Sequence, residues 1–187
     1  VAMRPVVANR GINISVDSEK WNGLLVKELA KITDFYAASC YPAPEKGLDE
    51  AKLLGSALRW TERIRPGLEK TLAAGPDQPP VWLMAWNAAE SPLLPALDGP
   101  AASCFGADMI GAFASGLVQS AHFSAAVKRL ADSDTGLLRA GSREPRGLYY
   151  GFRAWAAAGT LLHRTEAPPE LGAYLTSDGT RFVLILV

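Results

Sequence analysis

The side chains best placed for chemistry follow one apolar segment of the sequence. The stretch PPVWLMAWNAAES (79–91) is an apolar run that ends in Trp86 and Asn87, with the carboxylate of Glu90 shortly beyond. A buried strand that runs into a polar loop is a common support for binding and catalytic groups, because the strand fixes where the loop lies. This segment is therefore the first candidate for delivering a catalytic group.

The other reactive side chains form no recognisable cluster. Cys40 and Cys104 lie far apart, without CxxC spacing or a nearby histidine, so we predict no metal site and no disulfide, and expect both thiols in or near the core. His122 has no reactive neighbour in the sequence, and a lone histidine is more often a hydrogen-bonded core or rim residue than a catalyst. Asp98 and Asp108 are predicted to be solvated charges, Asp108 also suiting a helix N-terminus.

Composition and charge exclude several classes of partner. The 187 residues are 49% apolar, which suffices for a sizeable core, and 19 basic residues balance 19 acidic ones. Because the charges are scattered, we predict no nucleic-acid or anionic-membrane partner. Apolar runs are too short to cross a bilayer, and the N-terminus shows no charged-then-apolar leader. We expect a soluble chain, and the compartment stays open.

The chain alternates strand and helix signals before changing character at its end. The longest helical pattern is expected to break or kink at Pro66 and to end at Gly75. The final segment places two apolar runs around Ser177-Asp178-Gly179, a hairpin signal. The expected order is strand 6–15, helix 17–32, strand 33–42, helix 48–75, strand 80–86, loop 91–103, helix 105–120, strand 121–127, helix 144–159 and hairpin 171–187.

Four strands alternating with helices predict βα units and a parallel sheet, because parallel neighbours need a crossover connection. On periodicity alone, a doubly wound sheet and a barrel both remain open. No GxGxxG or Walker pattern follows any strand, so nothing indicates a nucleotide, and no cofactor is predicted.

Three stretches, taken in order, resemble part of the retaining clan-A glycoside hydrolases of the α-L-arabinofuranosidase and β-xylosidase type. TDFYAASCYP (33–42) resembles their sixth barrel strand, and PPVWLMAWN (79–87) resembles the seventh, commonly W-x-T-E-W, which presents the nucleophilic Glu. EPRGLYYGFRAW (144–155) and 171–187 resemble the last barrel helix and the start of an appended β-sandwich.

The resemblance implies an α/β fold, a partial (β/α)8 TIM barrel of about four βα units followed by a hairpin that begins a β-sandwich. Residues 1–163 would form the C-terminal half of the barrel, and residues 164–187 the start of the sandwich. Residues 6–15 would stand for the fifth barrel strand and 120–127 for the eighth.

The resemblance also implies a site at the C-terminal ends of the strands. Retaining hydrolysis needs two carboxyl groups about 5 Å apart, but Ala85 occupies the nucleophile position and the sequence has no Asn-Glu dipeptide for the acid/base. Glu90 is a weak substitute, more simply a solvated loop charge. Predicted to contact a carbohydrate are Tyr41, Trp86, Asn87 and His122, with Trp86 stacking on a sugar; Trp82 is expected in the core.

Several interpretations follow. The chain is either a fragment of a longer enzyme-like protein or a short protein whose open sheet edges are covered by self-association or a partner chain. Its function is glycoside hydrolase-like but inactive in this chain, a pseudoenzyme. The alternative is a noncatalytic carbohydrate-binding or scaffold protein that needs a partner to complete the barrel. An unrelated open α/β domain with both sheet edges covered is a third reading.

Overall fold

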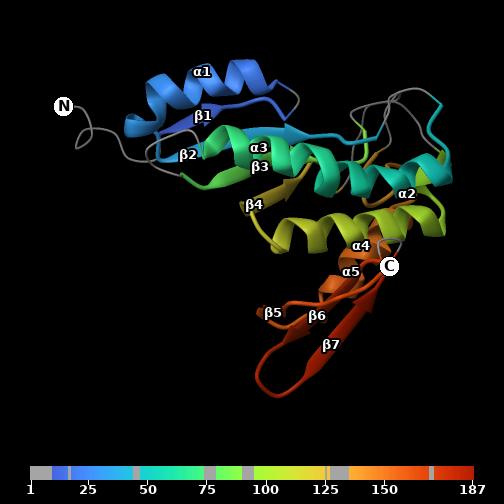
Figure 1. Cartoon of the computed structure of the whole chain (residues 1–187). Coiled ribbons are helices and arrows are strands. Elements are labelled where there is room, and N and C mark those ends of the chain that lie inside the picture. The colour runs from blue at the N-terminus through green and yellow to red at the C-terminus, as the bar shows by residue number, and fades with distance from the viewer. Residues whose placement is uncertain are drawn as a thin grey trace.

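The computed structural model describes residues 10–16, 18–43, 47–73, 79–89, 95–124, 126, 135–168 and 171–187. Helices and strands alternate over most of the chain, and three short strands follow (Figure 1). The elements are β1 (Gly11–Asn13), α1 (Glu19–Leu29), a 3-10 turn (Ala30–Ile32), β2 (Phe35–Cys40), α2 (Glu50–Arg59), a π-helical segment (Trp60–Ile64), α3 (Arg65–Leu72), β3 (Val81–Trp86), a 3-10 turn (Pro95–Leu97), α4 (Pro100–Ala114), β4 (Val118–Phe123), α5 (Gly147–Trp155), β5 (Leu161–His163), β6 (Ala173–Ser177) and β7 (Phe182–Leu186).

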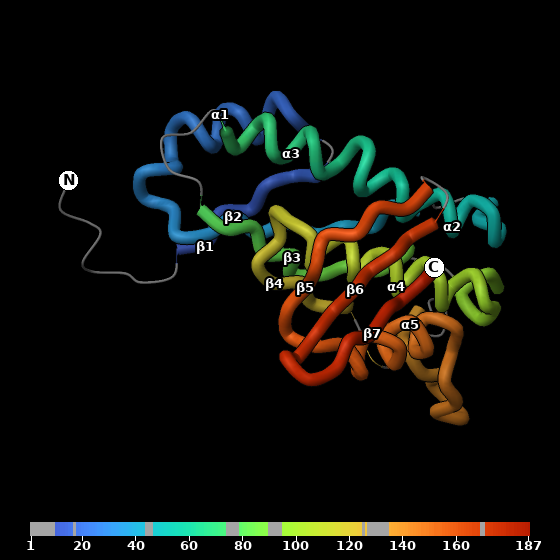
Figure 2. The backbone as a smooth tube through the Cα atoms, turned by 60° about the horizontal axis from the view of Figure 1, so that its bottom comes forward, coloured from blue at the N-terminus to red at the C-terminus, as the bar shows by residue number. Residues whose placement is uncertain are grey.

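The first four strands form one parallel sheet in the order β1-β2-β3-β4, as the alternating pattern predicts. One face of this sheet is buried, because Tyr36, Cys40 and Leu83 belong to a single core cluster with apolar residues of the helices. Helices α1 and α3 lie side by side over β1 and β2 in both views of the backbone (Figures 1 and 2). This face is therefore finished by the chain's own helices.

The opposite face of the parallel sheet, here called the open face, is only partly covered. Its residues alternate with the buried ones, and Met84 keeps 52% of its surface exposed. Phe35 stacks on Trp82 with ring centroids 4.1 Å apart, and Trp82 Nε1 donates to Gln119 Oε1 at 2.8 Å. The expectation of Trp82 in the core is wrong, because its strand position directs it to the open face, where it is half-buried.

The edges of this sheet also lack partners. Among the described residues, β1 and β4 each pair on one side only. An unpaired edge exposes a row of backbone donors and acceptors. A self-contained α/β domain with both edges covered is thus not what the described residues form.

The long helical pattern runs past Pro66 without breaking. Proline has no backbone N–H and its ring clashes with the carbonyl four residues earlier. Just before it, the five-residue segment Trp60–Ile64 is π-helical, and the Arg65 N–H bonds the Trp60 carbonyl. Since the wider π turn shifts the hydrogen bonds by one residue, Pro66 fits in the first turn of α3.

Helix α4 begins at Pro100 rather than near residue 105, and β4 begins at Val118, so residues 118–120 are strand and not helix. The helix packs closely on α5, as its small residues predict. A Cβ on Gly151 would lie 2.7 Å from the Ser103 carbonyl oxygen. No helix among the described residues is long and apolar enough to pass through a bilayer.

The last three strands form an antiparallel sheet in the order β5-β6-β7, which contacts α4 and α5 through Tyr174 and extends beyond these helices (Figure 1). The hairpin of β6 and β7 is confirmed, with Gly179 at φ +90° in its turn. Strand β5 was not predicted. Because it pairs with β6, the antiparallel sheet begins at Leu161, before the predicted boundary between residues 163 and 164.

Candidate functional site

A bulge shapes the C-terminal end of β3, where the nucleophile position was predicted. Leu83 and Trp86 are both buried although two residues separate them, and the pairing of β3 with β4 changes register between them. Ala85 is half-buried and pairs with Ser39 of β2, where the β2–β3 register also shifts. Bulges commonly re-aim side chains next to active sites. Ala85 therefore lies at a position whose direction the bulge sets, but its methyl group has no reactive atom.

Of the two carboxylates that follow β3 most closely in the sequence, the structure describes only Asp98. Glu90 lies outside the described residues. Asp98 is not the solvated charge expected from the sequence, because its carboxylate forms ion pairs with Arg146 Nε at 2.9 Å and with Arg139 Nη2 at 3.1 Å. Arg146 is itself buried, so this carboxylate neutralises a cation in the interior.

Trp86 lies in an aromatic cluster rather than at an open surface. Its ring is stacked on Phe152 at 5.5 Å between centroids and meets Phe113 and Phe123 edge-on. Only 2% of the residue is exposed. The prediction that Trp86 stacks on a sugar is therefore corrected, because its strand register turns it to the helix side, where Phe152 covers a face of its ring.

Asn87 is fully buried, and its amide is used within the protein. Its Nδ2 donates to the Thr135 carbonyl at 2.8 Å and to Ser124 Oγ at 3.2 Å, and its Oδ1 accepts from the Ala88 N–H. The side chain thus ties the segment after β3 to the segment after β4. Both amide groups are thus engaged inside the protein, and none of the residue is exposed to a sugar hydroxyl.

Tyr41 and His122 are accessible. Tyr41 is half-buried directly after β2. His122 is exposed and its Nε2 lies 3.0 Å from Ser120 Oγ, the hydrogen-bonded rim arrangement considered from the sequence. Ser120 pairs with Trp82, so both Ser120 and His122 belong to the open face. Contact of either residue with a carbohydrate stays a prediction.

The cysteines and other possible ligands do not gather. Cys40 is buried and Cys104 half-buried, and both are free thiols, as expected. In the part of the chain that the structure describes, no three His, Cys, Asp or Glu side chains lie together as a metal site would need.

One polar pair was missed by the sequence reasoning. Tyr174 Oη of β6 donates to Asp108 Oδ1 and, at 3.1 Å, to the Asp108 carbonyl oxygen. Asp108 lies within α4, which begins at Pro100, and not at the start of the helix as expected. Burial raises the pKa of the Asp108 carboxyl, while the Tyr174 hydrogen bond opposes that rise. Burial and the nearby carboxylate raise the pKa of Tyr174. A separation of 66 residues carries no local sequence signal for this pair.

No family model matches the sequence. No curated protein matches it. Solved structures do: an α-L-arabinofuranosidase from Thermotoga maritima is 15% identical with a TM-score of 0.63, covering 94% of this chain and 37% of that one. A GH39 enzyme from Xanthomonas axonopodis pv. citri is 16% identical with a TM-score of 0.62, and the match covers 92% of this chain and 36% of that one. A monomeric β-xylosidase from Caulobacter crescentus CB15 is 15% identical with a TM-score of 0.58, and the match covers 92% of this chain and 37% of that one.

These likenesses show a fold relationship to glycoside hydrolases with TIM-barrel folds. The chain spans little more than a third of the length of the structures it matches. The fold expectation is confirmed at that level, for a mixed α/β chain with a four-stranded parallel sheet.

Proposed function

We propose that this chain is the C-terminal half of a glycoside hydrolase-like barrel and that these 187 residues do not cleave glycosides by themselves. The observation that carries the proposal is the bulged end of β3, where Ala85 pairs with Ser39 beside the open face. By the resemblance, this position would hold the nucleophile. Retaining hydrolysis needs one carboxyl group there and a second about 5 Å away. A methyl group cannot attack an anomeric carbon.

Incubation of the purified chain with aryl arabinofuranosides, xylosides and glucosides tests the inactivity. We expect no release of the aryl alcohol above the rate of a heat-unfolded control. Robust turnover would overturn the proposal. If turnover appears and Glu90→Ala abolishes it, Glu90 is the displaced nucleophile; if turnover survives that change, the assignment of the site to the end of β3 is wrong.

The proposal includes a partner for the open face. An eight-stranded barrel encloses its interior face, whereas this sheet has four strands, and edges β1 and β4 have no second partner among the described residues. We propose that four further βα units, from another chain or from a longer polypeptide, complete the barrel. Tyr41 and His122 would then border the enclosed site.

Sedimentation of the isolated chain tests whether the partner is a second copy of this chain. Met84→Glu places a charge on the open face, and Glu28→Gln on α1 is an exposed control. A dimer that Met84→Glu dissociates, while Glu28→Gln leaves it intact, would support completion by a second copy. A chain that stays monomeric would assign the missing units to a different polypeptide segment, and a dimer indifferent to both changes would contradict the open face as the contact.

A noncatalytic carbohydrate-binding function is the second candidate. The open face favours it, because exposed Asn13, Ser39 and His122 share this face with the half-buried ring of Trp82. Polar groups beside an aromatic ring suit a sugar, which is apolar on its faces and polar at its edges.

Titration with arabino-, xylo- and gluco-oligosaccharides while tryptophan fluorescence is recorded tests this candidate. Trp82, and not the buried Trp86, is the expected reporter. The sugar-dependent signal should disappear in Trp82→Phe and persist in Trp86→Phe. The reverse pattern, or no signal with any of the sugars, would exclude binding at the open face.

A further inference from the structure

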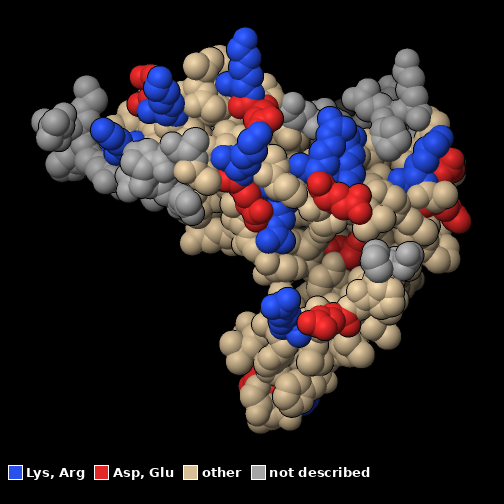
Figure 3. Space-filling model, viewed as in Figure 1, with Lys and Arg blue, Asp and Glu red and all other residues tan. Residues whose placement is uncertain are grey.

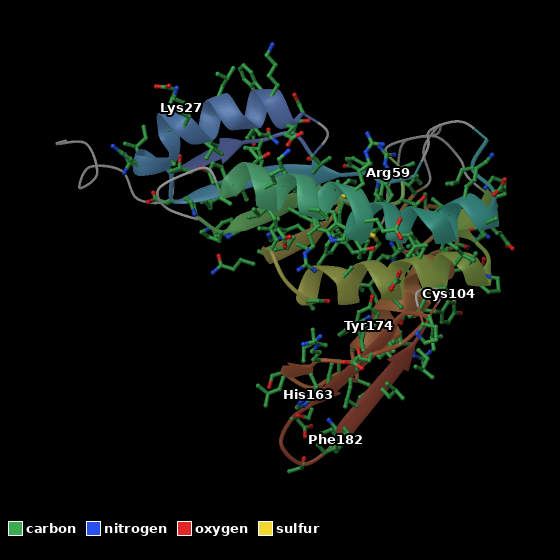
Figure 4. All side chains as sticks on the ribbon, in the orientation of Figure 1. Lys27, Arg59, Cys104, His163, Tyr174 and Phe182 are labelled. Atoms are coloured by element: carbon green, nitrogen blue, oxygen red, sulfur yellow. The ribbon has the colours of Figure 1, made fainter. Side chains whose placement is uncertain are left out.

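A groove lies away from the open face, between α2, α4 and the segment that leads into β6. Its volume is about 590 Å³, within the usual range for small-molecule sites. Leu54, Leu58 and Leu171 line it and are 44%, 41% and 41% exposed. Figure 4 shows Cys104 of α4 and Tyr174 of β6 on the same side of α4, where they contribute to the lining.

Asp108 is the only acidic side chain among the described residues that line this groove. Its Oδ1 is enclosed, because Tyr174 Oη donates to it and a Cβ on Gly172 would lie 2.6 Å from it. The described residues offer no hydrogen-bond partner to Oδ2 and no cation to the carboxylate. One oxygen is thus held by the protein and the other is left to the groove.

An ionised carboxylate in apolar surroundings is costly unless a positive charge or a hydrogen-bond donor meets it. The raised pKa of Asp108 has burial as its largest cause, in agreement with this geometry. A perturbed carboxylate in a cleft is a common mark of a binding site. The complementary ligand has an ammonium group for Oδ2 and an apolar body for the leucines.

We propose that this groove binds a small primary amine with an apolar body, an alkyl- or arylalkyl-ammonium ion, through Asp108. The amine lies along Leu54 and Leu58 with its nitrogen at Asp108 Oδ2, and Tyr174 holds the carboxylate in position. A sugar suits this lining poorly, because its many hydroxyls would face leucine side chains. The groove is separate from the end of β3, so it does not depend on the proposed glycosidase site.

Calorimetric titration of the whole chain at pH 7 with 2-phenylethylamine and with 2-phenylethanol tests the proposal. The two probes share an apolar body and differ in charge. We expect the amine to bind at least about tenfold more tightly, since a hydrogen bond to a charged group is worth that much or more. Equal affinities, or no heat with the amine at millimolar concentration, would overturn it.

Three variants locate the binding. Asp108→Asn keeps an acceptor for Tyr174 and should remove the advantage of the amine, whereas Glu28→Gln takes an equal charge from exposed α1 and should preserve it. Leu58→Ala at the rim should weaken both probes alike. Far-ultraviolet circular dichroism confirms that each variant is folded. An advantage that survives Asp108→Asn, or probe affinities unchanged in Leu58→Ala, would place the amine elsewhere and refute the groove.

Discussion

Each of the two sheets is covered by helices on one face and uncovered on the other, and the two uncovered faces differ in chemistry. The open face of the parallel sheet mixes Met84 and Trp82 with exposed polar residues such as Ser39 and His122. Strand β7 of the antiparallel sheet instead exposes Phe182, at 72%.

The antiparallel sheet is also apolar along its outer strands. Leu184, Leu186 and Leu161 are 56%, 59% and 58% exposed. The register puts Phe182, Leu184 and Leu186 on one side of β7, since they alternate with Val183 and Ile185. In the side view of the surface, most of this projecting region carries no charge (Figure 3).

This difference separates two uses of an uncovered sheet face. A face with interspersed polar groups suits a solvated site, while an uncharged aliphatic face suits packing against another sheet about 10 Å away. The β-sandwich expected from the sequence agrees with the second use, and it stays a prediction.

The largest expected effect contrasts the core of the parallel sheet with the open side of β7. Trp86→Ala removes a ring that contacts Phe113, Phe123 and Phe152 and should lower the free energy of unfolding by about 3–5 kcal/mol. Phe182→Ala removes a ring that is mostly in water and should cost less than about 1 kcal/mol. Urea unfolding of both variants gives the comparison; similar losses would mean that Phe182 is covered in solution.

A middle-sized effect sharpens how the parallel sheet is closed at its C-terminal end. Asn87→Ala leaves the Ala88 N–H and the Thr135 carbonyl without their side-chain partner, for a loss of about 1–3 kcal/mol. His122→Ala, at an exposed position on the same sheet, is the matched control and should change stability little. If the two variants unfold at the same urea concentration, Asn87 is not the tie between β3 and β4.

A smaller effect lies where the two regions meet. The folded state raises the pKa of Asp108, so it binds the proton more tightly than the unfolded chain does. The stabilisation by the protonated form is complete below pH 3.8, the unfolded value, and is lost as the pH rises through the folded pKa. Asp108→Asn should therefore raise the thermal midpoint at pH 7 and lose this advantage toward pH 4. Thermal unfolding across this pH range measures it, and a lowered midpoint at pH 7 would contradict burial as the dominant cause.

The smallest effect concerns the exposed turn of the antiparallel sheet. Hydrogen bonds from the Arg181 N–H first, and from Thr180, lower the pKa of Asp178. The contribution of this carboxylate is present above its unfolded pKa and is lost as the pH falls through the lower folded value. Asp178→Ala should speed hydrogen exchange of the Thr180 and Arg181 backbone N–H groups at neutral pH. It should leave the free energy of global unfolding, which Trp86→Ala lowers, unchanged. Exchange rates that do not move would show that Gly179 alone holds the turn.

Local pattern was enough to place most elements. Strands β2 and β3, the helices between them and the hairpin around Gly179 could all be predicted, because their signals lie within a few neighbouring residues. The start of α4 was placed too late, although Pro100 at the first position of the helix is a helix-start signal. The three-residue β5 could not be placed, since it exists only through pairing with β6. Tyr41 was expected at the end of a strand and directly follows β2, whereas His122 was expected at the start of a strand and lies near the end of β4. The burial of Trp86 and Asn87 could not be predicted from the sequence.

By itself, the sequence determined the order of the βα units, the closing hairpin and the absence of a carboxylate at Ala85, because these follow from residue identity and short-range periodicity. Only the tertiary structure decided that Trp86 faces the helices and that Asn87 is consumed in bonds between segments, since a bulge changes which side of a strand each residue faces. It also brought Tyr174 to Asp108, a contact between residues 66 positions apart that no local pattern encodes.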